Sequence, residues 1–437
     1  MSAVKVLIVD DSTFYRKRLK EMFDTDPEID VVGEAANGKI AVEMTRTLKP
    51  DVITMDVEMP VMGGIEAVKK IMEICPTPVL MFSSLTEEGA RETLEALSSG
   101  ASDYLPKDFA GIARRKTQVV QDLCAKVKAL GSSIMYRSRR LAAESSDQGA
   151  VAVSRTQTNE SSSRRLRGST PGFMTPAELK SRPAESRWDN SRQTQKAIQA
   201  MSNVEARLEA LINRKKAELN ALTNLKKSQE IRNEVLQHHK SSVPEGSTDY
   251  QILAIGSSTG GPNALQVIIS ELPETIPFPI VVAQHMTALF TKSFAERLNK
   301  LSRLNVKEAE DGEQLKPGWV YIAPGGRQIT VTSRYPRNFR ISVIDSPPEV
   351  YYRPSVDILM GSLSRCAGLK VLAIILTGMG QDGKMGCKLL HDKGSEIWAQ
   401  DEMTSVIYGM PKAVAGFASR ILPLQDIAGE IVGTIVK

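Results

Sequence analysis

The sequence is poor in aromatic residues, cysteine and histidine, and each shortage narrows the classes of protein that it can encode. Aromatic residues make up 5% of the 437 positions, which argues against a protein that binds nucleic acid by stacking bases on aromatic rings. The four cysteines are scattered and form no C-x-x-C pair. We therefore expect buried free thiols in a reducing cytosol rather than disulfides or a zinc site.

Long apolar runs and a large net charge are also missing. No run approaches the roughly 18 apolar residues that a membrane span requires, and the first residues, MSAVKVLIVDD, contain two aspartates where a secretory signal is apolar. The net charge is only +5, and much of the excess comes from Arg and Lys between about residues 137 and 240. We expect a cytoplasmic protein that is not embedded in a membrane and does not bind nucleic acid.

The first 130 residues alternate short apolar runs with longer amphipathic stretches. The apolar runs are Val4–Val9, Asp30–Gly33, Val52–Met55, Pro78–Phe82 and Asp103–Leu105, and the clearest helical stretches are Ser12–Phe23, Ile65–Ile74 and Glu87–Leu97. Strands that alternate with helices in this way indicate a doubly wound parallel sheet covered on both faces. We predict one α/β domain over residues 1–130.

A linker is predicted over residues 131–247. From about residue 132 to residue 194 the chain is rich in Ser, Arg, Thr and Gly, and such a segment buries too little apolar surface to offset the entropy of ordering it. From about 195 to 237 apolar residues recur at helical spacing, which predicts one long amphipathic helix. Lys215 falls in the apolar seam, so a coiled-coil dimer is not favoured over docking on a neighbouring domain or a receptor.

A second α/β region extends from residue 248 to residue 437. Its strands read ILAIG, PIVVAQ, VLAIILTG and SEIWAQ, and each precedes a helical pattern. This pattern predicts a second, Rossmann-like parallel sheet. The expected architecture is thus α/β, with two doubly wound parallel-sheet domains joined by a long linker that is partly disordered and partly helical.

Acidic residues follow the predicted strands of the first domain. Asp10 and Asp11 end the first strand and Asp56 ends the third, while Ser83 ends the fourth and Lys107 follows the fifth. Because the carboxyl ends of parallel strands meet at one edge of a sheet, we expect these side chains to converge. Mg²⁺ suits such a cluster, a carboxylate beside it can attack a phosphoryl group, and a lysine can neutralise the developing charge.

This set of residues resembles the response-regulator receiver family over about the first 120 residues. The resemblance implies a flavodoxin-like fold with Asp56 as the phosphoacceptor and with Asp10 and Asp11 helping Asp56 to organise Mg²⁺. It also implies that Ser83 and Tyr104 form the switch pair and that the lysine after the fifth strand contacts the phosphoryl group.

A serine-containing turn follows the first strand of the second domain. The segment from Gly256 to Gly260, GSSTG, matches G-x-S-x-G, in which a sharp strand-to-helix turn exposes a serine at the edge of the sheet. The glycines let the backbone turn tightly, and the next helix N-terminus offers backbone N–H groups to an oxyanion. On its own the pattern is weak, because a Gly/Ser loop after a strand binds phosphate equally well. The candidate nucleophile is Ser258.

A base and a carboxylate are available at two further strand ends. His285 directly follows PIVVAQ, and Asp382 lies in the glycine-rich turn after VLAIILTG. The other histidines, His238, His239 and His391, lie in the linker or after a helical pattern and are expected to be surface residues. The three candidates together form a set of the kind found in serine hydrolases, in which the carboxylate orients the imidazole. Their order, Ser…His…Asp, differs from that of the α/β-hydrolases.

From about residue 250 to the end, the sequence resembles the chemotaxis protein-glutamate methylesterases (the CheB family). The matching stretches are IGSSTGGPNAL, AQHMTALFTKSFAERLN, YIAPGG, RPSVD, ILTGMGQDG and QDEMTSVIYGMPKAV. The resemblance implies that Ser258 is the nucleophile, His285 the base and Asp382 its orienting partner. It also implies that the backbone at Met379 forms part of an oxyanion hole and that the esterase needs no cofactor.

The two resemblances together imply a phosphorylation-regulated hydrolase of bacterial chemotaxis. It is expected to release methanol from glutamate methyl esters on methyl-accepting chemoreceptors and to deamidate receptor glutamines. The chemotaxis histidine kinase is the expected phosphodonor, and recruitment to chemoreceptor arrays in the cytoplasm is expected. Two departures are visible in the second domain, since the family often has histidine after APGG, where Arg327 stands, and before RPSVD, where Tyr351 and Tyr352 stand.

Two alternatives from other classes stay open. A non-enzymatic receiver-containing signalling adaptor would use the long linker helix to bind its partner, but it leaves Ser258, His285 and Asp382 unexplained. A receiver-driven transcription regulator would need a helix-turn-helix after the first domain, and residues 132–240 offer a disordered tract and a single helix instead.

Overall fold

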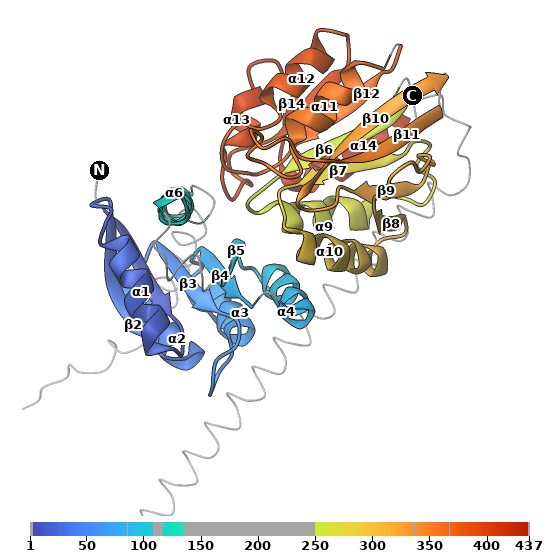
Figure 1. Ribbon diagram of the computed structural model, residues 1–437. Helices are drawn as coiled ribbons and strands as arrows, with labels where there is room; N and C mark the ends of the chain where they lie inside the picture. Colours follow the sequence, from blue (N-terminus) through green and yellow to red (C-terminus); the bar gives the residue numbers. More distant parts are fainter. Residues whose placement is uncertain are drawn as a thin grey trace, which may run out of the picture. The chain divides into compact units, whose positions relative to one another are not determined.

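The computed structural model describes two α/β domains (Figure 1). The described residues are 3–84, 86–107, 117–133, 136, 250–335, 338–366 and 368–435. Both domains belong to one compact unit, which comprises residues 1–157 and 246–437. The disordered tract and the long helix that we predict for the linker lie outside the described residues.

The first domain is a five-stranded parallel sheet of order β2-β1-β3-β4-β5. The strands are β1 (Val4–Val9), β2 (Ile29–Ala35), β3 (Val52–Asp56), β4 (Val79–Ser83) and β5 (Asp103–Pro106). The helices are α1 (Thr13–Phe23), α2 (Gly38–Leu48), α3 (Gly64–Ile74), α4 (Glu87–Ser98) and α6 (Thr117–Gly131). This strand order is that of flavodoxin-like folds, so the predicted fold class of the first domain is confirmed.

Local sequence explains where these helices begin. The side chains of Ser12, Asn37 and Thr86 each accept a backbone N–H from the first turn of the helix that follows. Caps of this kind stabilise a helix by about 1 kcal/mol each. Each cap places a helix start just after a strand, at the edge of the sheet that the predicted acidic cluster occupies.

Packing of the first domain continues past the predicted boundary at residue 130. Tyr136 is buried, and its hydroxyl accepts a hydrogen bond from Ser102 Oγ at 2.9 Å. Its ring belongs to the same apolar cluster as Leu130 and Val127 of α6. The segment after α6 therefore contributes to the core of the domain through Tyr136.

The second domain is built on a seven-stranded parallel sheet of order β14-β13-β12-β6-β7-β9-β8. The strands are β6 (Ile252–Ser257), β7 (Ile280–Gln284), β8 (Asn305–Glu308), β9 (Trp319–Ile322), β12 (Val371–Ile375), β13 (Glu396–Gln400) and β14 (Arg420–Leu422). The helices are α9 (Gly261–Glu271), α10 (Ala288–Leu301), α11 (Val356–Ser364), α12 (Lys384–His391), α13 (Met410–Val414) and α14 (Leu424–Ile435). An antiparallel hairpin, β10 (Arg327–Tyr335) with β11 (Asn338–Asp345), lies outside this sheet.

Alternation along β6 divides the second domain into two apolar layers. Leu253 and Ile255 belong to the cluster that contains α9, α10 and α14. Ile252 and Ala254 belong to the cluster that contains α11, α12 and α13. Successive side chains of a strand point to opposite faces, so this strand needs apolar residues throughout, which explains the unbroken run ILAI.

Strand order reverses between β6 and β12. From β6 the chain builds β7, β8 and β9 on one side, and from β12 it builds β13 and β14 on the other. Ligands of open α/β sheets bind beyond the carboxyl ends of the strands at such a switch point. The predicted nucleophile follows β6, and the predicted carboxylate follows β12, so both lie at the switch point.

Two expectations about whole-chain properties can be compared with the structure. All four cysteines are free, and Cys75, Cys124 and Cys387 are buried while Cys366 is half-buried. In the part of the chain that the structure describes, no helix combines the length and apolarity that crossing a membrane requires.

Candidate functional site

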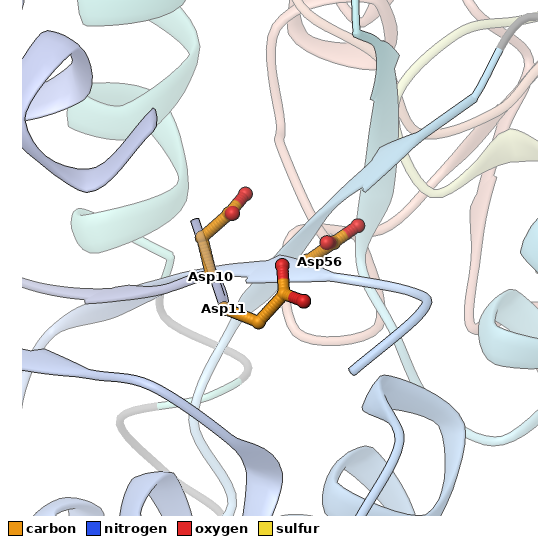
Figure 2. A group of neighbouring side chains, drawn as sticks. All are labelled: Asp10, Asp11 and Asp56. Carbon is orange, nitrogen blue, oxygen red and sulfur yellow. The ribbon is translucent and has the colours of Figure 1, made fainter. Parts of the chain in front are cut away.

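Three carboxylates meet at the carboxyl edge of the first sheet. Asp10 and Asp11 follow β1, and Asp56 is the last residue of β3. One oxygen from each residue can be chosen so that all three lie within 4.8 Å of one another, and Figure 2 shows the three side chains. Asp10 and Asp56 are buried, whereas Asp11 is exposed. This set of hard oxygen donors fits Mg²⁺, which takes one or two carboxylates and keeps waters for a phosphate.

Lys107 bridges the two buried carboxylates. Its Nζ lies 2.9 Å from Asp10 Oδ2 and 2.6 Å from Asp56 Oδ2. Burial raises the pKa of Asp56 to about 6, although the nearby Lys107 opposes that rise. Burial also acts to lower the pKa of Lys107, but its hydrogen bonds to Asp56 and Asp10 outweigh burial and raise it. The lysine therefore stays cationic between the two carboxylates.

The buried Asp56 carboxylate is expected to cost stability at neutral pH. A carboxyl pKa that is higher in the folded than in the unfolded state means that the cost is full above pH 6 and disappears as the pH falls towards 4. The free energy of unfolding of Asp56→Asn should therefore exceed that of the parent by about 3 kcal/mol at pH 7.5 without divalent cations, and by about half as much at pH 5. Urea unfolding of both proteins at the two pH values measures the difference.

The exposed carboxylate of Asp11 offers a matched control for this stability change. Asp11→Asn removes the same charge from the same cluster but should alter the free energy of unfolding by less than about 0.5 kcal/mol. A less stable Asp56→Asn protein at pH 7.5, or a difference that does not change with pH, would contradict the expected cost of the buried charge.

The two residues of the predicted switch pair are buried, and each contacts groups other than the carboxylates. Ser83 ends β4, and its hydroxyl donates to the carbonyl of Gly89 in α4 at 3.0 Å. Tyr104, in β5, packs its ring on Phe290 of α10 with 4.2 Å between ring centroids. Burial and the neighbouring Asp103 raise the pKa of Tyr104 above its usual value. In this structure neither hydroxyl reaches the acidic cluster.

The first domain also contacts the turn that carries the predicted nucleophile. The hydroxyl of Thr259 donates a hydrogen bond to the Asp103 carboxylate. The same carboxylate forms an ion pair with Lys126 of α6, with 2.6 Å between Lys126 Nζ and Asp103 Oδ2. Asn263 of α9 donates to the carbonyl of Leu97 in α4 at 2.6 Å. The end of α4 and the start of β5 in the first domain are thus joined to the serine turn and the start of α9 by direct hydrogen bonds.

Ser258 lies in a tight turn between β6 and α9. The turn is possible because Gly260 adopts a left-handed backbone conformation, with φ of 79°. The N–H of Ser258 donates to the carbonyl of Thr377 at 3.1 Å, which fixes the turn to the end of β12. Gly378 packs against Ser258, and a Cβ there would come within 2.8 Å of the serine Cβ. Only glycine fits at this contact.

The neighbouring Ser257 has a different environment. It is fully buried, and its hydroxyl donates to Gln284 Oε1 at 2.6 Å. Ser258, by contrast, is partly exposed and lines a cavity of about 430 Å³ together with His285, Met379 and Tyr352. Of the two serines in the motif, Ser258 is therefore the one whose hydroxyl can meet a substrate.

His285 and Asp382 are brought together as the sequence predicts. The imidazole Nε2 lies 2.8 Å from Asp382 Oδ2. The other ring nitrogen, Nδ1, is buried and has no hydrogen-bond partner within the described residues. Serine proteases of the chymotrypsin type bind the carboxylate through Nδ1 instead. Because an ionised carboxylate only accepts hydrogen bonds, Nε2 carries the proton of the neutral ring, and the lone pair is on Nδ1.

The start of α11 holds the Asp382 carboxylate. It accepts hydrogen bonds from Ser355 Oγ at 2.9 Å, from Val356 N at 2.7 Å and from Asp357 N at 3.0 Å. Burial acts to raise the pKa of Asp382, but the hydrogen bond to His285 and the backbone N–H groups hold it below its usual range. A helix N-terminus favours negative charge, so this carboxylate is ionised at neutral pH.

Two side chains that the sequence analysis did not single out position the site. Gln284, at the end of β7, donates from Nε2 to the carbonyls of Ser258 and His285 at 3.0 and 3.1 Å. Ser355 caps α11 and also binds Asp382. The signal for Ser355 was present in RPSVD, where a serine precedes an apolar helical run. The signal for Gln284, a polar residue ending an apolar strand, was weaker.

The remaining histidines do not belong to this site. His391 ends α12, its side chain is exposed, and its Nδ1 lies 3.2 Å from the carboxylate of Asp392. His238 and His239 lie outside the described residues. Within the described part of the chain, His285 is therefore the histidine that faces the nucleophile loop.

Known proteins resemble this chain over nearly its whole length. The family described as CheB methylesterase matches residues 253–431, and the family described as response regulator receiver domain matches residues 6–116. Protein-glutamate methylesterase/protein-glutamine glutaminase 2 of Photobacterium profundum is 42% identical over 430 residues, covering 98% of each chain. The protein-glutamate methylesterase/protein-glutamine glutaminase of Shewanella frigidimarina is 43% identical over 431 residues, again covering 98% of each.

A solved structure matches the second domain. The catalytic domain of the Thermotoga maritima CheB methylesterase is 42% identical, covers 42% of this chain and 98% of its own, and has a TM-score of 0.41. The two full-length relatives are more than 40% identical to this chain over both the receiver and the catalytic regions, which establishes the family. The chain belongs to the CheB methylesterase family, with a response-regulator receiver domain at its N-terminus.

Proposed function

We propose that this chain hydrolyses γ-methyl esters of glutamate on methyl-accepting chemoreceptors, with Ser258 as nucleophile, His285 as base and Asp382 as the residue that orients the base. It is a protein-glutamate methylesterase/protein-glutamine glutaminase that serves adaptation in chemotaxis. The observation that carries the residue assignment is the 2.8 Å contact between His285 Nε2 and Asp382, with His285 lining the same cavity as the partly exposed Ser258.

The reaction is an acyl transfer in two halves. Ser258 Oγ attacks the ester carbonyl while its proton passes to His285 Nδ1, the ring nitrogen that has the lone pair. The tetrahedral intermediate collapses, the bond to the methoxy oxygen breaks, and the imidazolium returns the proton so that methanol leaves. Water then attacks the acyl-serine by the same route and releases the free glutamate carboxylate.

Backbone N–H groups near Ser258 would stabilise the oxyanion. The N–H of Met379 donates to no acceptor within the described residues, and Met379 lines the same cavity as Ser258. The start of α9, directly after the serine turn, adds the positive end of a helix dipole. A preorganised donor of this kind contributes roughly a hundredfold to a thousandfold in rate.

The same residues would deamidate glutamine side chains on the receptor. Attack on the amide carbonyl forms the same acyl-serine, and His285 protonates the departing amine so that ammonia leaves. An amide has the poorer leaving group, so we expect deamidation to be slower than demethylation at the same receptor site.

The receiver domain is proposed to accept a phosphoryl group on Asp56 from the chemotaxis histidine kinase. Asp10, Asp11 and Asp56 would hold Mg²⁺, which neutralises charge on the phosphoryl oxygens when bound. Asp56 supplies the attacking carboxylate oxygen, and Lys107 stays close enough to pair with the new phosphoryl group. The Ser83 hydroxyl would leave the carbonyl of Gly89 and donate a hydrogen bond to a phosphoryl oxygen. The Tyr104 side chain would change its position in response.

Phosphorylation is proposed to release the catalytic site from the receiver. In the structure, Asp103 and Leu97 of the receiver accept hydrogen bonds from Thr259 in the serine turn and from Asn263 in the first turn of α9. A movement of Tyr104 would disturb its packing on Phe290. Phosphorylation at Asp56 would then shift the population towards a form in which a receptor helix reaches Ser258. We place this enzyme in the cytoplasm, at chemoreceptor arrays.

Methanol release from methylated receptors tests the proposed function. Purified full-length protein is incubated with membranes containing methylated chemoreceptor, and methanol and ammonia are quantified while mass spectrometry follows the modified receptor sites. Methanol together with new glutamate carboxylates is the expected result. Absence of both products, with or without a phosphodonor, would favour the non-enzymatic adaptor instead.

A further inference from the structure

The ring of Tyr352 covers one face of the catalytic imidazole. The centroids of the Tyr352 and His285 rings are 4.2 Å apart, and the ring planes differ by only 9°. Tyr352 is half-buried and lines the cavity that Ser258 lines. Its hydroxyl lies over Gly380, where a Cβ would come within 2.8 Å of it. The tyrosine thus spans from the base to the turn that carries Asp382.

A buried glutamine fixes the segment that carries this tyrosine. Gln328 of β10 is fully buried, and its Nε2 donates to the carbonyl of Tyr352 at 2.8 Å. Its Oε1 accepts from the N–H of Ser355, also at 2.8 Å. The same segment then delivers Ser355 and the start of α11 to Asp382. One short stretch therefore contacts both the ring of the base and the carboxylate that orients it.

The hydrogen bond to Asp382 and the stack on Tyr352 both restrain the His285 ring. Asp382 binds a single edge atom, Nε2, and such a bond still allows the ring to tilt about it. Nδ1 has no hydrogen-bond partner within the described residues, so no second polar contact prevents that tilt before substrate binds. A ring stacked on the face of the imidazole resists tilting, and its negative π face also favours the imidazolium that forms during attack.

We propose that Tyr352 is a positioning residue for His285: its ring face, held by Gln328, keeps the imidazole in the plane in which Nε2 meets Asp382 and Nδ1 is left to take the proton of Ser258. This inference rests on the proposed function, because it assigns a role within the same catalytic site. The ring face carries the role, and the hydroxyl group does not take part in it.

Removal of the ring face should lower kcat with little effect on KM. We expect Tyr352→Leu and Tyr352→Met to release methanol with kcat lower by about tenfold or more, and with KM within about twofold of the parent. Tyr352→Phe keeps the ring face and should retain at least about half of the parent kcat. Two aliphatic variants are used so that poor folding of one does not decide the result.

A spectroscopic readout separates positioning from a merely structural role. The chain has four histidines, so ¹⁵N-histidine spectra are simple, and a His285→Gln protein identifies the His285 signals. The parent and Tyr352→Phe proteins should show one tautomer with the proton on Nε2. Tyr352→Leu and Tyr352→Met should show signals averaged between tautomers, at unchanged melting temperature.

The outcomes distinguish this inference from the proposed function. An active parent whose aliphatic variants keep kcat within twofold, or keep the single Nε2–H tautomer, overturns the role of Tyr352 alone. Equal losses in Tyr352→Phe and Tyr352→Leu also overturn it, since the hydroxyl would then matter. A parent that releases no methanol at all overturns the proposed function itself.

Discussion

Ser258→Ala should lower methanol release from methylated chemoreceptors by up to roughly a millionfold, the loss seen when a triad enzyme loses its nucleophile. The physical reason is that no other hydroxyl can take its place. Ser258 lines the cavity next to His285, whereas the adjacent Ser257 is fully buried and donates its hydroxyl to Gln284. The loss in rate is measured by quantifying the methanol that purified full-length proteins release over time.

Ser257→Ala is the matched control, because it deletes the same atom one residue away. It removes a hydrogen bond to Gln284, the side chain that ties the carbonyls of Ser258 and His285 together. We expect a loss of less than about a hundredfold, since positioning is weakened but the nucleophile remains. If the two alanine variants lost activity equally, or if Ser258→Ala kept more than about a hundredth of it, the assignment of the nucleophile would be wrong.

Asp382→Asn should lower kcat by about 10⁴-fold while the protein stays folded. The amide no longer favours the imidazolium, and its NH₂ group can donate where the carboxylate accepts, which disfavours the proton on Nε2. The start of α11 adds to the effect, because Ser355 and the N–H of Val356 lose a charged acceptor. The measurement is kcat for methanol release, with circular dichroism to confirm folding.

Asp357→Asn provides the comparison for this second variant. Asp357 is near Asp382 in the fold, but its carboxylate accepts the N–H of Gly386 in the first turn of α12. The side-chain oxygen of asparagine can accept the same N–H, so kcat should stay within about tenfold. An Asp382→Asn protein with kcat similar to that of Asp357→Asn would contradict the role of Asp382 in orienting the base.

The sheets and the strand-end residues were predictable from the sequence because parallel strands are buried on both faces. Runs such as ILAIG and VLAIILTG are apolar throughout, and a parallel sheet brings their carboxyl ends to one edge. The positions of Asp56, Ser258, His285 and Asp382 follow from that rule. The fold class and the family are confirmed, and the structure brings His285 and Asp382 into contact.

Other features depend on tertiary contacts that no local pattern encodes. Strands β8 and β14 have four and three residues, too few to show a period, and the β10–β11 hairpin was not singled out. Gln284 and Gln328 look like ordinary polar residues in or after strands, yet each binds two backbone groups in a buried place. Which nitrogen of His285 faces Asp382 is likewise decided by ring orientation, which spacing along the chain does not specify.

The central claim is that phosphorylation of Asp56 controls hydrolysis at Ser258, and one comparison tests it most directly. Methanol release from methylated receptor is measured for the parent and Asp56→Asn, each with Mg²⁺ and with or without a small-molecule phosphodonor. We expect the phosphodonor to raise the parent rate at least several-fold and to leave the basal rate of Asp56→Asn unchanged. Equal stimulation of both proteins, or of neither while methanol is released, would contradict control through Asp56.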